Sequence, residues 1–159
     1  MVIAINCLIS LFVTISNIYK YNDTIKVNEG KNIMKRELTI ALLDEIQDSF
    51  NRQDVDEILS HFVEECVWVM ARGPNEPEGR RCIGKSEIGK VLSDRYENIP
   101  DMRWEDIKHW ICDQDKAISE WVVRGKPING EAFSYLGCDL WAFSEGYVTK
   151  KDTYWKFIG

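Results

Sequence analysis

The sequence predicts an α+β domain in which a long antiparallel sheet bends around N-terminal helices. Up to Pro100, apolar residues recur mainly at three- and four-residue spacing, which is the period of amphipathic helices. After Pro100 this period disappears, and four alternating stretches are separated by short turn sequences. The chain has 159 residues, 45% of them hydrophobic, which is enough for one domain with a substantial core. Helices first and a strand meander last is an element order of the α+β class.

Three helices are expected before Pro100. The first covers 36–50, where apolar residues form one stripe. Asp54 stands at the N-cap position of the second, and Glu57 follows three residues later as its capping-box partner. The third covers 86–96. Between the second and third helices, 66–70 is expected to form a strand and 73–79, which contains two glycines and two prolines, a loop.

Four strands are expected after Pro100, at 102–112, 116–125, 131–143 and 147–157. The segments between them are short and contain the Asp, Asn, Gly, Pro and Ser residues that hairpin turns need. Each strand should therefore pair with the next in antiparallel fashion.

Residues 1–33 are expected to lie outside the fold, and 34–159 to form the domain. The stretch from Met1 to Tyr19 carries no charged side chain, and its length is close to that of a membrane-spanning helix. It is weak as a secretory signal because no basic residue precedes its apolar run. It is either a polar, marginal membrane anchor or a segment upstream of a true start at Met34.

Composition argues against several classes of function. A net charge of −6 disfavours binding to nucleic acid or to anionic lipid. Five widely spaced cysteines without a C-x-x-C motif indicate neither a disulfide framework nor a zinc site, and they favour the cytoplasm. His61 and His109 are the only histidines. We expect His61 at the surface, His109 beside a cross-strand partner, and no metal site or cofactor.

The segment 79–86 matches the phosphate-binding pattern G-x-x-x-x-G-K-S, but its context is wrong for that role. A phosphate-binding loop follows a buried parallel strand, whereas a Pro- and Glu-rich stretch precedes this one. Its two arginines and Ile83 are more typical of a short strand. Nucleotide binding is therefore not expected.

The order of several short motifs across 36–159 resembles the nuclear transport factor 2-like superfamily, in its SnoaL-like and ketosteroid isomerase-like branch. The motifs are the helix junction 50–56, the stretch 59–68, the segment 79–84, Glu120-Trp121, the run 137–146 and the closing Tyr154-Trp155. The resemblance implies a cone-shaped α+β barrel with helices packed in a strongly curved antiparallel sheet. It also implies an internal, mostly apolar pocket.

The resemblance further implies which residues face this pocket. In relatives the Asp on the penultimate strand points inward, so period-two alternation assigns inward faces on the neighbouring strands. The site residues expected on this basis are Asp139 and Lys151, and the pocket residues are Trp68, Met70, Trp121, Tyr135, Trp141, Thr153 and Trp155.

Departures from the family pattern narrow the expected chemistry. Ketosteroid isomerases use a tyrosine and an Asp base where this sequence has Ile46 and Met70, and only their second Asp has a counterpart, Asp139. As a site, Asp139 would be a general acid or base, while Lys151 would stabilise an enolate or phenolate or lose its own proton. Alternatively, Lys151 points outward and Asp139 is only hydrogen-bonded.

Three functions stay open at this point. The first is a cofactor-independent lyase, isomerase or cyclase that uses Asp139 on a small apolar or aromatic substrate. The second is a non-catalytic module that binds a small molecule. The third is a protein-interaction domain that uses the exposed sheet face. We also expect a homodimer, because that face carries Ile118, Val122 and Leu140 between charged residues.

Overall fold

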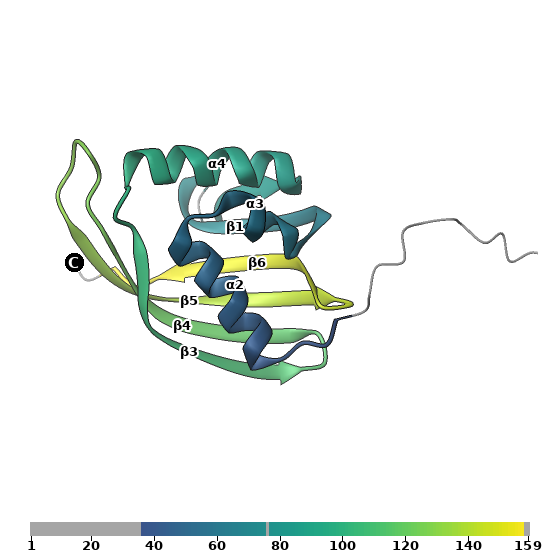
Figure 1. Cartoon of the computed structure of the whole chain (residues 1–159). Coiled ribbons are helices and arrows are strands. Elements are labelled where there is room, and N and C mark those ends of the chain that lie inside the picture. The colour runs from purple at the N-terminus through teal and green to yellow at the C-terminus, as the bar shows by residue number, and fades with distance from the viewer. Residues whose placement is uncertain (1–35, 76, 158–159) are drawn as a thin grey trace, which may run out of the picture. The chain divides into compact units, whose positions relative to one another are not determined.

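The computed structural model of the chain describes residues 36–75 and 77–157 (Figure 1). Its helices are α2 (Ile40–Arg52), α3 (Val55–Ser60) and α4 (Gly84–Asn98). Its strands are β1 (Phe62–Asn75), β2 (Gly79–Ile83), β3 (Arg103–Asp113), β4 (Lys116–Gly125), β5 (Phe133–Ser144) and β6 (Tyr147–Trp155). The expected leader, 1–33, falls outside the described residues. No helix in the described ranges has the length and apolar character to cross a membrane.

The six strands form one curved, open sheet in the order β2-β1-β6-β5-β4-β3, and the helices lie against one face of it (Figure 1). The α+β class and the antiparallel meander β3 to β6 are as predicted. The sheet is nevertheless mixed, because β1 pairs with β6 in parallel. That pairing joins segments far apart in sequence, for which hairpin signals give no indication.

The first two helices begin where side chains can cap them. The backbone N–H of Leu42 donates to Thr39 Oγ1 at the start of α2, so this helix begins four residues later than predicted. The predicted Asp54 cap of α3 is present, with Glu57 N–H donating to Asp54 Oδ1 at 3.0 Å. Gln53, between the two helices, has a φ of 58° and ends α2 in the left-handed conformation.

Strand β1 is much longer than the predicted strand 66–70, and it overturns part of the predicted loop. Residues 73–75 belong to β1, and Gly79 begins β2. The two strands pair in antiparallel fashion with a register irregularity between Met70 and Asn75. Gly79 has a φ of 86°, a conformation that a residue without a side chain adopts readily. The Gly- and Pro-rich composition therefore marks an irregular hairpin. The predicted short strand before Gly84 is β2.

The core fills the space between the helices and the concave face of the sheet. It includes large aromatic rings from α2, β1, β3, β4 and β5, namely Phe50, Trp68, Trp104, Trp121 and Trp141. The prediction for His61 was wrong: this residue is 2% exposed. His61 ends α3, its carbonyl accepts from Val148 N–H at 2.8 Å, and its Nδ1 lies 3.3 Å from Arg36 Nη1. The turn into β1 thus draws its ring inward.

Candidate functional site

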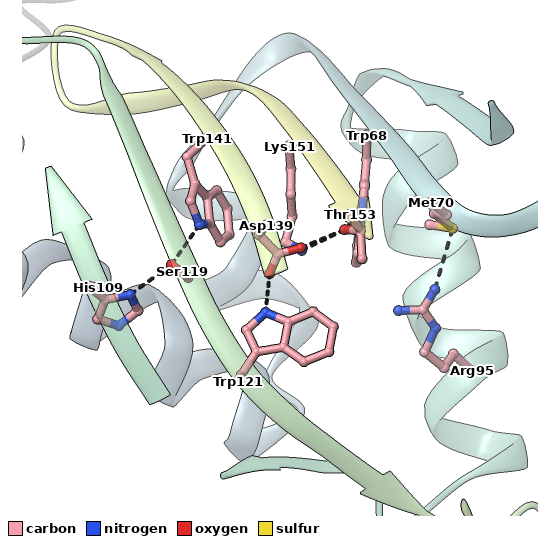
Figure 2. Close-up of polar contacts among 10 residues, drawn as sticks. All are labelled: Trp68, Met70, Arg95, His109, Ser119, Trp121, Asp139, Trp141, Lys151 and Thr153. Atoms are coloured by element: carbon pink, nitrogen blue, oxygen red, sulfur yellow. Dashed lines mark hydrogen bonds and ion pairs between the residues drawn. The ribbon is translucent and has the colours of Figure 1, made fainter. Parts of the chain in front are cut away.

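A cluster of buried polar side chains lies on the concave face of β5 and β6 (Figure 2). Asp139 on β5 is the register partner of Thr153 on β6, and Lys151 faces the same side two residues earlier. Asp139 is 1% exposed and Lys151 is 4% exposed. Adjacent strands carry inward side chains at every second residue, so the pleat itself brings these three groups together. The alternative in which Lys151 points into solvent is excluded by this burial.

Both side-chain oxygens of Asp139 accept hydrogen bonds. Its Oδ2 accepts from Trp121 Nε1 at 2.7 Å. Its Oδ1 accepts from Thr153 Oγ1 at 2.6 Å and from the Lys151 ammonium, with which it forms an ion pair. A buried carboxylate is tolerated when charge and hydrogen bonds replace its lost hydration, and this arrangement supplies both.

Lys151 sits among aromatic rings. Its Nζ lies 4.6 Å from the ring centre of Trp68, 4.8 Å from that of Trp141 and 5.6 Å from that of Phe50. Burial lowers the pKa of Lys151 below its usual value, and the charge and hydrogen bond of Asp139 oppose that shift. The ammonium donates to Asp139 and Thr153, which leaves its third hydrogen without a hydrogen-bonding side chain among the described residues.

Thr153 links the cluster to the wall of the cone. Its Oγ1 accepts from Trp68 Nε1 at 2.9 Å and from Lys151 at 3.0 Å, while its own hydrogen goes to Asp139. Trp121 is positioned from the other side by a glycine: a Cβ at Gly137 would lie 2.3 Å from the Trp121 ring. The cluster is therefore held rigidly by the residues around it.

A small cavity of about 50 Å³ adjoins the cluster. Six predicted residues line it, namely Trp68, Met70, Trp121, Lys151, Thr153 and Trp155. The other three predicted residues, Asp139, Trp141 and Tyr135, are not among its lining residues. Asp139 is covered by Lys151, Thr153 and Trp121, whose side chains occupy its oxygens. The charged group that reaches the cavity from this pair is consequently Lys151.

Sequence reasoning missed four lining residues, Ala71, Arg72, Arg95 and Trp104. Arg95 lies on α4, where it follows Leu92 by three residues and so continues the buried stripe of that helix. Its guanidinium carbon lies 5.2 Å from the ring centre of Trp68, and its Nη2 is 3.4 Å from Met70 Sδ (Figure 2). The helical period could have identified Arg95 as an inward-facing cation.

An aromatic stack extends from this cavity to the surface. Trp155 lines the cavity and stacks on Tyr135 and Phe133 with ring centres 5.4 Å and 6.1 Å apart. Phe157 contacts Trp155 at 6.2 Å and is 48% exposed. The guanidinium of Arg72 lies over three of these rings, at 4.7 Å from Phe157 and 5.9 Å from Trp155. We call Phe133, Tyr135, Trp155 and Phe157 the aromatic stack.

A second polar group contains Ser119, His109 and Asp44. Ser119 Oγ is 2.7 Å from His109 Nδ1, and His109 Nε2 is 3.5 Å from Asp44 Oδ1. Trp141 Nε1 donates to the same Ser119 oxygen at 2.8 Å. Ser119 is fully buried and does not line the cavity, so it cannot act on a substrate there. The group instead joins β3 and β4 to β5 through Trp141 and to α2 through Asp44, and the contact of His109 with Ser119 is the expected cross-strand contact.

The described residues contain no group of three or more His, Cys, Asp and Glu side chains that could hold a metal ion. The segment 79–86 forms β2 and the first residues of α4, with an antiparallel strand before it, which differs from a phosphate-binding loop.

Comparisons with known proteins agree with this architecture. A family model described as a SnoaL-like domain matches residues 43–150. A candidate polyketide cyclase from Xanthomonas campestris pv. campestris is 21% identical, with a TM-score of 0.64 over 74% of this chain and 89% of its own. A hypothetical protein from Catenulispora acidiphila with a ketosteroid isomerase-like fold, in complex with trimethylamine, is 13% identical, with a TM-score of 0.64 over 76% and 88%.

TerC, co-crystallized with polyporic acid, is 18% identical, with a TM-score of 0.62 over 74% of this chain and 90% of its own. No curated protein matches the sequence. At these identities the structural likeness shows the fold, and the chemistry has to be argued from the residues.

Proposed function

Because the chain belongs to the SnoaL-like domain family, within the nuclear transport factor 2-like superfamily, we propose that it binds a small apolar or aromatic molecule beside Lys151. There it acts as a cofactor-independent lyase, isomerase or cyclase whose proton transfers depend on Asp139 and Lys151. TerC, of similar fold, was co-crystallized with polyporic acid, which supports a small-molecule ligand.

The observation that carries the proposal is a buried ion pair of which one member borders a cavity. Lys151 lines that space and donates only two hydrogen bonds among the described residues. Burial lowers its pKa, so it gives up a proton more readily than a surface lysine. Next to a substrate carbonyl, the ammonium would stabilise the negative charge that develops on oxygen when an enolate or phenolate forms. Asp139 orients the ammonium and balances its charge, so it acts through Lys151.

The size of the cavity sets a requirement on this function. About 50 Å³ holds one or two water molecules at roughly 30 Å³ each, whereas small-molecule sites usually offer about 300 Å³ or more. A substrate must therefore displace part of the wall. The aromatic stack is the suitable part, because it reaches the surface through Phe157 and is made of side chains close to the end of β6.

A non-catalytic binding module is the second candidate function. It is favoured by the three hydrogen bonds that Asp139 already accepts from protein side chains, which involve both of its oxygens. In this case the cluster stabilises the cavity wall, and Lys151 only attracts the ligand.

We also propose a homodimer formed through the outer face of the sheet. Ile118 and Leu140 are cross-strand neighbours there, as are Val122 and Leu136, and Leu140 is 41% exposed. Such an apolar face on an antiparallel sheet is stabilised by a covering partner. Sedimentation should give twice the mass of one chain, and Leu140→Glu should halve it. A monomer that captures a different protein through this face would favour the interaction-domain alternative.

Free thiols at Cys66, Cys82, Cys112 and Cys138 support our proposal of a cytoplasmic location.

Native mass spectrometry of freshly purified protein tests the proposed function. We expect a retained small molecule, and we expect Lys151→Met to lose it. Lys150→Met is the matched control, because Lys150 is the preceding residue but is exposed on the outer face, where it pairs with Asp152 at 3.0 Å. Once the molecule is identified, turnover by the wild type and not by Lys151→Met or Asp139→Asn distinguishes the enzyme from the binding module. Equal retention by both lysine variants would contradict the site.

A further inference from the structure

The side chains around the cavity are charged with one sign only. The lining residues include three cations, Arg72, Arg95 and Lys151, and no Asp or Glu, although the chain as a whole has a net charge of −6. The rest of the lining is mainly aromatic, with the four tryptophans Trp68, Trp104, Trp121 and Trp155. Positive charge collected in a cleft with apolar walls produces a strong local attraction for anions.

Arg95 is the cation whose charge is least well compensated by solvent and carboxylates together, since Arg72 is exposed and Lys151 pairs with Asp139. Among the described residues, no carboxylate oxygen lies within 4.0 Å of its guanidinium nitrogens. Its side-chain partners are the thioether of Met70, a weak acceptor, and the face of Trp68. Burial lowers the pKa of Arg95, which reflects the cost of keeping this charge away from water.

Asp139, the buried carboxylate that the described residues place near these cations, already has a charged partner. Asp139 forms its ion pair with Lys151, so it neutralises that ammonium and leaves Arg95 unbalanced. Both cations lie over the ring of Trp68, at 4.6 Å for Lys151 Nζ and 5.2 Å for Arg95 Cζ, and repulsion from Arg95 contributes to the lowered pKa of Lys151. The described residues therefore supply no negative charge in the cavity that balances Arg95.

From this charge imbalance we propose that the ligand of the cavity is an aromatic anion: a flat ring system bearing a carboxylate or an ionised hydroxyl. The inference rests on the proposed function, whose ligand class it names. The anionic group lies between Arg95 and the free ammonium hydrogen of Lys151, where charged hydrogen bonds are strongest because water is excluded. The ring lies among the tryptophans and displaces the aromatic stack from Trp155 outward.

Three probes of the same shape test the sign of the charge: 1-naphthoate, the neutral 1-naphthamide and the cationic 1-naphthylmethylamine. Binding to the full chain is measured by isothermal titration calorimetry, and contact with the cavity by a change of affinity in either direction in Trp155→Ala, because Trp155 lines the cavity. We expect naphthoate to bind at least about tenfold more tightly than the amide, the size of one charged hydrogen bond, and the amine to bind least.

Arg95→Met should remove this preference while leaving the affinity for naphthamide within about twofold, because only the charge-dependent contact is lost. Arg95→Lys should restore part of it. Arg103→Met is the matched control, since Arg103 is an exposed arginine paired with Glu105 at 2.6 Å, and it should change nothing. Circular dichroism verifies that each variant is folded.

Two outcomes would overturn the inference, and they separate it from the proposed function. Cavity binding of naphthamide or the amine as tight as that of naphthoate would refute the anion assignment but leave small-molecule binding intact. Binding of none of the three probes at millimolar concentration, in a protein that retains no small molecule on purification, would refute both.

Discussion

Replacement of Asp139 by asparagine gives the most direct measure of the buried ion pair. The amide side chain would keep the shape of the carboxylate and an acceptor for Trp121 or Thr153, but it would remove the negative charge beside Lys151. Loss of one partner from a buried pair costs about 3–5 kcal/mol, because the other charge stays desolvated. That is roughly a fifth or more of the ~5–15 kcal/mol that stabilises a typical domain.

The assay is urea unfolding of the full chain, applied as a double-variant cycle. Lys151→Met alone leaves the buried carboxylate of Asp139 without its charged partner, so it should lower the free energy of unfolding by about as much as Asp139→Asn does. The double variant contains neither charge, so it should be at least about 2 kcal/mol more stable than the sum of the single losses predicts. Asp152→Asn is the control: its pair with Lys150 lies on the outer face, with 47% of the Lys150 side chain exposed, and should contribute about 1 kcal/mol or less.

The loss should also depend on pH in a defined direction. In the fold, burial holds the pKa of Lys151 below its usual value, whereas an unfolded lysine titrates near ~10.4. Between these two values the unfolded chain binds more protons, so stability falls as pH is lowered. Without Asp139 the pKa of Lys151 is lowered further. The loss of unfolding free energy in Asp139→Asn, relative to the wild type, should therefore become smaller as the pH is raised toward ~10. The reasoning would be refuted if the free-energy losses of the two single variants simply add in the double variant, or if the loss in Asp139→Asn does not change with pH.

Four further predictions concern other parts of the chain. Gly137→Ala should cost about 1–3 kcal/mol in urea unfolding and alter tryptophan fluorescence, because the new methyl overlaps Trp121; unchanged stability would contradict the tight packing. Thr153→Val should cost about 1–3 kcal/mol in the same assay, since it leaves a buried indole N–H unpaired, and Thr153→Ser should recover most of this. Burial lowers the pKa of His61, so stability should be fully present above about 6.5 and fall as pH drops through the lowered pKa; His61→Gln should flatten that part of the melting-temperature profile. A chain beginning at Met34 should melt at the same temperature as the full chain if residues 1–33 lie outside the fold, and a lower temperature would show that they contribute to it.

Much of the candidate site could be predicted because strand alternation is a strict geometric rule. Once one inward residue of β5 is assigned from the family pattern, period two fixes the facing of Asp139 and Trp141, and hairpin pairing brings Lys151 and Thr153 beside them. The inward orientation of Lys151 contradicts the usual exposure of lysines, and alternation proved the better guide.

Features that depend on contacts between distant segments could not be predicted. The parallel pairing of β1 with β6 has no local sequence signal. His61 lies off the apolar face of its helix, and only the turn into β1 buries it. Arg95 differs in part: the helical stripe of α4 indicates that it faces inward, but its charge favours solvent, and only packing places its guanidinium beside Trp68. In the last two cases a polar or charged side chain lies in a buried environment that its residue type does not favour, as happens at sites where function opposes stability.

The β1–β6 pairing also determines when the site can form during synthesis. Strand β1 carries Trp68 and leaves the ribosome before the other described strands, whereas its neighbour β6, with Lys151, is the last of the described strands to emerge. Contacts of such large sequence separation form slowly, because a long loop must close before they yield any energy. One edge of β1 therefore stays unpaired until β6 is available, and an unpaired strand edge favours aggregation. Because Lys151 lies on β6, a chain that is truncated or stalled before this strand contains most of the described domain and still has no site.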